Sequence, residues 1–138
     1  MTKKKSNQIT LRDKVTLDGV GLHTGKNVRL TFRPAPVDTG YVFIRTDLKP
    51  IVEIPADIIY VTNTDRGTNL EKDGAKIQTS EHVLAALVGM SIDNCFIELD
   101  SAESPIMDGS SKFFVEAIES VGIREQDKLR EGFIVTDL

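Results

Sequence analysis

The sequence is poor in the residues that build disulfides and membrane spans. Cys95 is its only cysteine among 138 residues, so an internal disulfide is excluded and a reducing compartment, the cytoplasm, is expected. No apolar run is long enough to cross a bilayer. No apolar segment follows the lysines at positions 3–5, so we expect a flexible basic tail over residues 1–8 rather than a secretory signal.

Positive charge is not in excess either. The chain has 17 Lys and Arg against 21 Asp and Glu, a formal net charge of −4, which offers no general attraction for nucleic acid. Hydrophobic residues make up 40% and charged residues 28%, which is usual for a soluble globular protein. The length suits one domain with a real core.

Apolar alternation and turn residues predict mostly strands in the first half of the chain. The expected extended segments are 9–17, 28–32, 41–46, 52–54, 68–70, 75–77, 94–99 and 132–136, with a tight hairpin at Asp73-Gly74. Two helices are expected, one from Ser80 to Gly89 and one from about Ser110 to Gly122. This order favours an α+β two-layer sandwich, a mainly antiparallel sheet with both helices on one face.

The tripeptide Ser80-Glu81-His82 opens the first of these helices. Ser80 is a candidate N-cap, and the expected apolar face comprises Val83, Leu84, Leu87 and Val88. The positive end of the helix dipole favours Glu81 as an anion and His82 as a neutral imidazole that can ligate a metal. A general base beside a zinc ligand suits metal-assisted hydrolysis. A solvated or core histidine is the structural alternative.

Two other segments are candidate cleft walls. The glycine-rich segment 19–25 lacks the pattern of a dinucleotide or Walker loop, so we expect a turn built on positive-φ glycines that presents Leu22 and His23. The polar loop at 62–68 is either a solvated connection or, through Thr64, part of a cleft. Catalytic zinc needs three protein ligands, and His23 and His82 are the only histidines. The composition therefore allows at most part of a zinc site.

Several motifs, in order along the chain, resemble one enzyme family. They are GVGLHTGK at 19–26, RPAP at 33–36, RTDL at 45–48, TSEH at 79–82, IDN at 92–94 and PIMDGS at 105–110. Together they resemble UDP-3-O-acyl-N-acetylglucosamine deacetylase, the zinc hydrolase of lipid A biosynthesis in Gram-negative bacteria. The fourth motif, TSEH, departs mildly from the family's usual Thr-Val-Glu-His.

The resemblance implies half of a two-domain enzyme. Residues 9–124 would form the first domain, and 125–138 a linker and the start of a truncated second domain. Glu81 would be the general base and His82 one of three zinc ligands, the other two lying in the missing domain. Leu22, His23, Thr64, Arg66 and Gly67 would border the nucleotide-sugar substrate, UDP-3-O-acyl-N-acetylglucosamine. The form of the 64–68 segment also resembles family members fused to a 3-hydroxyacyl-carrier-protein dehydratase.

Two further expectations accompany this interpretation. A separated first domain would expose its interdomain face near Val83, Leu87 or the Thr64 loop and self-associate. The alternative function is a non-catalytic two-layer module that binds a partner protein or nucleotide sugar. A related fold occurs in the second domain of a small-subunit ribosomal protein, a likeness with little functional weight.

Overall fold

A five-stranded sheet forms the centre of the molecule. The structure, a computed structural model, describes residues 6–57, 61–63, 69–78 and 81–130. The sheet has the strand order β2-β3-β9-β4-β5. Its neighbours run antiparallel except β4 and β9, which are parallel. The strands are Val15–Val20 (β2), Asn27–Pro34 (β3), Tyr41–Arg45 (β4), Val52–Pro55 (β5) and Cys95–Leu99 (β9).

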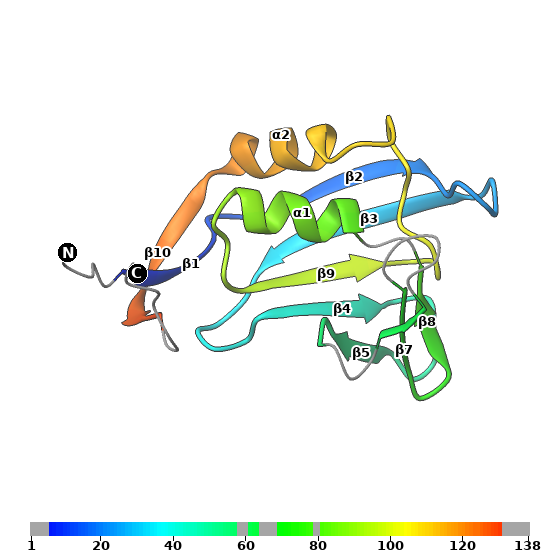
Figure 1. Cartoon of the computed structure of the whole chain (residues 1–138), viewed down its shortest axis with the longest axis horizontal. Coiled ribbons are helices and arrows are strands. Elements are labelled where there is room, and N and C mark those ends of the chain that lie inside the picture. Colours follow the sequence, from blue (N-terminus) through cyan, green and yellow to red (C-terminus); the bar gives the residue numbers. More distant parts are fainter. Residues whose placement is uncertain (1–5, 58–60, 64–68, 79–80, 131–138) are drawn as a thin grey trace.

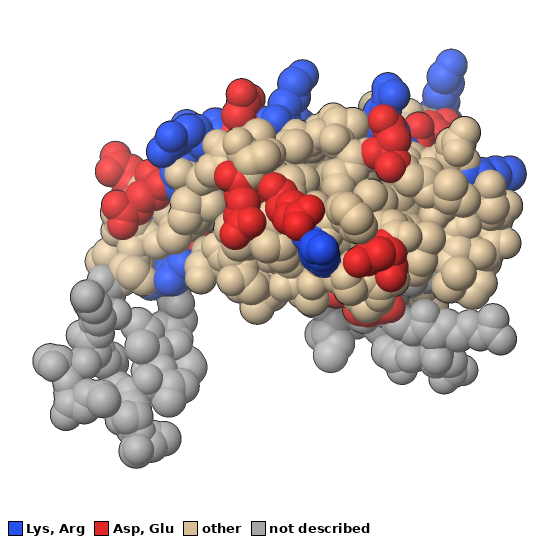
Figure 2. All heavy atoms as spheres, turned by 90° about the horizontal axis from the view of Figure 1, so that it is seen from above, with Lys and Arg blue, Asp and Glu red and all other residues tan. Residues whose placement is uncertain are grey.

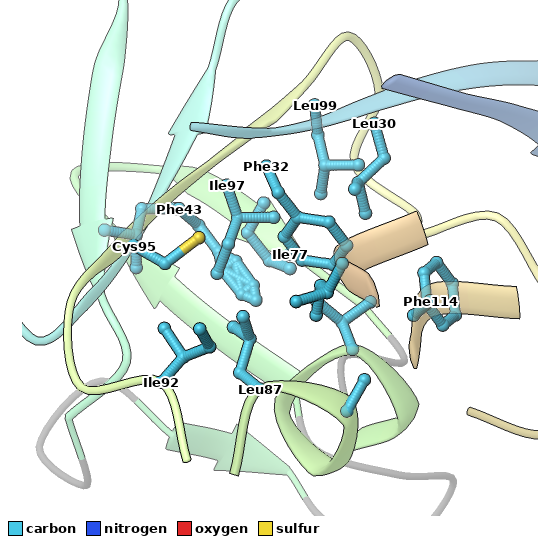
Figure 3. Packing of buried hydrophobic residues seen from close by; sticks show 14 of the residues in the cluster. Leu30, Phe32, Phe43, Ile77, Leu87, Ile92, Cys95, Ile97, Leu99 and Phe114 are labelled. Carbon is cyan, nitrogen blue, oxygen red and sulfur yellow. The ribbon is translucent and has the colours of Figure 1, made fainter. Parts of the chain in front are cut away.

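Both helices, α1 (Glu81–Gly89) and α2 (Lys112–Val121), cover one face of this sheet (Figure 1). Every second residue of the central strands points into the layer between sheet and helices, as the two-residue period of a strand requires. Figure 3 shows Phe32, Ile97 and Leu99 of the sheet directed toward Leu87 of α1 and Phe114 of α2. The rings of Phe32 and Phe114 meet edge to face with centroids 6.2 Å apart. The predicted α+β two-layer sandwich is confirmed.

The predicted hairpin at Asp73-Gly74 is also confirmed. It joins β7 (Asn69–Lys72) to β8 (Ala75–Ile77), and these pair with β6 (Val61–Asn63) in a second, three-stranded sheet. Asp73 and Gly74 have φ values of 52° and 81°. Two positive φ angles at the central positions match the twist of a two-residue hairpin. This small sheet leads directly toward the start of α1 (Figure 1).

A two-stranded ribbon stands apart from both sheets and was not predicted. It pairs β1 (Asn7–Leu11) with β10 (Ile123–Leu129) in antiparallel register. β1 begins inside the segment expected to be a flexible tail, and β10 runs through position 124, the expected domain boundary. The strand predicted at 132–136 lies outside the described residues.

The apolar face of α1 differs from the prediction. Val83, Ala86 and Leu87 are buried, whereas Leu84 is half-buried and Val88 is 65% exposed. The side of α1 that packs against the sheet is therefore narrower than the predicted face of four apolar residues. In α2 the buried residues are Phe114 and Ile118.

Candidate functional site

Glu81 and His82 are the first two residues of α1 and lie side by side. Oε1 of Glu81 is 3.8 Å from Nε2 of His82, and each side chain is 36% exposed. Water and ligands can therefore reach both groups, while the helix start favours an anion at Glu81. Ser80, the predicted N-cap, lies outside the described residues.

The face of α1 that presents Glu81 continues as an apolar surface. Leu84, Ala85 and Val88 follow at spacings of three, four and seven residues, which share one side of a helix. Ala85 and Val88 are exposed and Leu84 is half-buried. We call these three residues the outer face of α1. The exposed face was expected near Val83, Leu87 or the Thr64 loop; Val83 and Leu87 themselves pack into the core.

An ion pair between a buried arginine and a partly exposed aspartate supports the strand that precedes α1. Arg45 of β4, 7% exposed, donates two hydrogen bonds to the carboxylate of Asp47, at 2.9 and 2.8 Å, and one to the carbonyl of Lys76 in β8 at 2.8 Å. The Arg45 hydrogen bonds hold the pKa of Asp47 below its ordinary value. Arg45 thereby ties the end of β8, and with it the approach to Glu81, to the central sheet.

The turn between β2 and β3 presents Leu22 and His23, as predicted. Leu22 is 58% exposed, and the His23 side chain is 42% exposed. The backbone N–H groups of His23 and Thr24 donate to the carboxylate of Glu103 at 2.9 and 3.1 Å. Nε2 of His23 lies 4.0 Å from Glu103 Oε2. The structure thus places His23 against Glu103.

The glycines of this turn act by close approach more than by positive φ. Gly25 alone among its three glycines has a positive φ, 68°. Gly19 lies in β2, where an added Cβ would sit 2.7 Å from Cβ of Pro105. At Gly21 it would sit 2.4 Å from Oε1 of Glu103. The predicted conformational reason is therefore wrong for Gly19 and Gly21, where a neighbouring segment occupies the space of a side chain.

Three of the predicted substrate-binding residues, Thr64, Arg66 and Gly67, lie outside the described residues. Glu103, which is fully buried, was not predicted from the sequence. A single acid in a short polar segment carries no periodic signal of burial, so only its contacts reveal it.

The described residues fit one part of a zinc site. His82 offers an accessible imidazole with a carboxylate beside it, a suitable first ligand and base. Within the described ranges, no group of three His, Cys, Asp or Glu side chains is placed to hold a metal ion. The donor set of this part of the chain is therefore short of the three protein ligands that catalytic zinc needs.

Charges on the surface are mixed in sign. On the face seen from the α2 side, basic and acidic side chains of the described residues are interspersed, and the basic ones do not form a continuous patch (Figure 2). No helix within the described residues is both long and apolar enough to span a membrane. This face of mixed charge gives no electrostatic support for nucleic-acid binding.

Fold and site together define a two-layer α+β domain that exposes a carboxylate and an imidazole beside an apolar helix face. The family model described as UDP-3-O-acyl N-acetylglycosamine deacetylase matches residues 8–137. The chain belongs to this family.

Curated relatives agree with the family match. A UDP-3-O-acyl-N-acetylglucosamine deacetylase of Hahella chejuensis is 58% identical over 94% of this chain and 45% of its own length. The UDP-3-O-acyl-N-acetylglucosamine deacetylase of Chromohalobacter salexigens is 55% identical over 86% of this chain and 39% of its own length. The "Bifunctional enzyme LpxC/FabZ" of Chlorobaculum tepidum is 49% identical over 94% of this chain and 28% of its own length. The chain thus spans less than half of each of these relatives.

Proposed function

We propose that this chain supplies one half of the active site of a zinc-dependent deacetylase. The reaction is hydrolytic removal of the N-acetyl group from UDP-3-O-(3-hydroxyacyl)-N-acetylglucosamine, a step of lipid A biosynthesis, in the cytoplasm. The observation that carries the proposal is the exposed pair Glu81 and His82, 3.8 Å apart at the start of α1, in a chain of the deacetylase family.

In this proposal His82 holds the zinc ion, and the remaining ligands come from a second domain. The chemistry that zinc supplies when bound is activation of water and polarisation of a carbonyl oxygen. Glu81 accepts the proton of the water that attacks the acetamide carbonyl, since a general base must lie within reach of that proton and be accessible to water. Leu22, His23 and the loop with Thr64, Arg66 and Gly67 border the substrate.

The outer face of α1 supports a partner domain at this position. Leu84, Ala85 and Val88 continue the side of the helix that presents Glu81. An exposed apolar surface next to an incomplete ligand set is what a second domain would cover. The bifunctional name of the Chlorobaculum relative also agrees with the resemblance to dehydratase fusions, which the reading frame after Leu138 would test.

Two substitutions in the full-length protein test the roles of the pair. We expect Glu81→Gln to lower kcat by roughly 10²–10⁴-fold, the usual contribution of a general base, with zinc content unchanged. His82→Ala should lower the zinc content after dialysis. Acetate release measures turnover, and elemental analysis measures zinc. Glu98→Gln, which alters a partly exposed ion pair with Arg33 on the open sheet face, is the matched control. Equal turnover of Glu81→Gln and wild type would remove Glu81 from the mechanism.

The isolated 138-residue chain tests the division of the site. We expect it to bind zinc weakly and to show negligible turnover, because its described residues hold no three-ligand group. Robust turnover by this chain would refute the half-site proposal. A full-length protein that binds the nucleotide sugar without hydrolysing it would favour the alternative, a non-catalytic binding module.

A further inference from the structure

Glu103 is a buried carboxylate, and its side-chain partners among the described residues belong to the turn that carries Leu22, His23 and Thr24. Its side chain is 0% exposed. Oε2 accepts from the His23 N–H at 2.9 Å, and Oε1 accepts from the Thr24 N–H at 3.1 Å. Removing a carboxylate from water is unfavourable unless such donors replace the lost hydration. The turn and Glu103 therefore hold each other in place.

The backbone around Glu103 contacts both this turn and Gln78, which follows β8. On one side, Gln78 donates to Ala102 at 2.7 Å and accepts from Ser104 at 3.3 Å. On the other side, Pro105 forms an isolated bridge with Gly21, the residue before Leu22. Gln78 is three residues before Glu81. The segment 102–105 thus connects the turn that carries His23 to the start of the helix that carries the acid–imidazole pair.

The turn is also shaped to admit this carboxylate. A Cβ at Gly21 would lie 2.4 Å from Glu103 Oε1 and 2.7 Å from Thr24 Oγ1. Real Cβ atoms are essentially never found so close to another atom. Because Glu103 is buried and hydrogen-bonded, it cannot swing into solvent to make room. Any side chain at position 21 must therefore displace the turn or break its bonds to Glu103.

We propose that Glu103 is a positioning residue that fixes the Leu22–His23 turn relative to Glu81 and His82. This inference rests on the proposed function, in which the turn borders the substrate. Glu103 itself does not touch the reacting atoms. It acts through two backbone hydrogen bonds, which are strengthened by its charge. Loss of these bonds moves a binding surface, so substrate affinity should suffer more than the chemical step.

Kinetics of Glu103→Gln and Gly21→Ala in the full-length protein test the proposal. Glutamine keeps the size of the side chain but loses the charge and one acceptor oxygen, whereas alanine at position 21 keeps the charge and pushes the turn away. Each variant should raise KM about tenfold, the loss expected when hydrogen bonds to a charged group are weakened, with kcat changed by less than about twofold. The double variant should raise KM less than the product of the two single effects, because both disturb one contact.

Nuclear magnetic resonance gives a readout that does not depend on activity. The His23 and Thr24 amide protons should move upfield in Glu103→Gln and exchange faster with solvent, because they lose a carboxylate acceptor. Glu98→Gln and Gly89→Ala are the matched controls, since Glu98 lies on the open sheet face and a Cβ at Gly89 meets no atom within 4 Å. Both controls should keep the wild-type KM and amide positions.

A destabilised variant separates positioning from general loss of stability. Asn94→Ala removes a buried network at the opposite end of β9 and should keep the wild-type KM despite lower stability. Wild-type KM in both Glu103→Gln and Gly21→Ala, or unchanged His23 and Thr24 amide signals, would overturn the positioning role. Absence of turnover in the wild-type full-length protein would instead overturn the proposed function and, with it, the substrate-directed part of this inference.

Discussion

Cys95 and Tyr41 are two titratable residues whose pKa values are raised in the folded protein. Burial raises the pKa of the Cys95 thiol to about 12, against an ordinary value of 9.0. Burial also raises the pKa of Tyr41 to about 12, from 10.0, and its hydroxyl donates to the Ile92 carbonyl. Cys95 is completely buried in the core cluster.

These shifts predict a loss of stability at alkaline pH. The unfolded chain releases the Cys95 proton near pH 9.0, whereas the folded chain keeps it until about pH 12. Unfolding therefore releases a proton in this window, and the free energy of unfolding falls as pH rises through it, by up to about 1.4 kcal/mol per pH unit for one group. Cys95→Ala should remove this pH-dependent loss of the free energy of unfolding. The difference in this free energy between the wild type and Cys95→Ala should therefore narrow above about pH 9.

Urea titrations from about pH 8 to about pH 11 measure this effect. Native Cys95 should also react slowly with a thiol reagent and react at once after unfolding, because the thiolate is the reactive form. A stability gap that stays constant across the pH range would contradict the predicted linkage.

At the scale of elements, the prediction succeeded where burial follows a period. In β3 and β9 every second residue is buried, so alternation revealed both strands. β10 carries no such signal, because all but one of its seven residues are exposed and its pairing rests on backbone hydrogen bonds. Glu103 was missed for a related reason, since its burial depends on partners about 80 residues earlier. Contacts between distant segments leave no local pattern.

Asn94 joins the ribbon to the central sheet. Its amide nitrogen donates to Gln8 of β1 at 2.9 Å and to Gln126 of β10 at 2.8 Å, and its oxygen accepts from the Gly40 N–H at 2.9 Å. The side chain is almost fully buried. We expect Asn94→Ala to lower the free energy of unfolding by about 2 kcal/mol, because it leaves buried partners unsatisfied.

Urea unfolding followed by circular dichroism measures this change. Glu98→Gln provides the contrast, since its ion pair with Arg33 at 3.1 Å is partly exposed and should contribute less than about 1 kcal/mol. If Asn94→Ala lowers the free energy of unfolding no more than Glu98→Gln does, the hydrogen bonds of Asn94 do not stabilise the ribbon.

At the scale of the whole molecule, the chain combines a well-packed core with what we propose to be half of an active site. Its buried cluster unites the central sheet and both helices, so the domain is packed without help from a partner. Its pair Glu81 and His82, however, opens onto an exposed surface. The sequence could predict the core, because core residues follow strand and helix periods, whereas the half-site was inferred from the count of histidines and stays a prediction. The sequence could not predict which side of α1 is exposed. Val83, Leu84, Leu87 and Val88 are all apolar, so either the side with Val83 and Leu87 or the side with Leu84 and Val88 could face the core.

The isolated chain should self-associate through the outer face of α1. Val88 is 65% exposed there, beside Ala85 and the half-buried Leu84, and in the proposed function a second domain covers this surface. We expect sedimentation to show concentration-dependent oligomers. Val88→Lys should shift the distribution toward monomer, because burying a lysine between two copies is costly. Ile51→Lys is the matched control, since Ile51 is 57% exposed and lies on the loop before β5, outside this helix, and should leave association unchanged. A strict monomer across a wide range of concentration, or an equal effect of both substitutions, would refute association through this face.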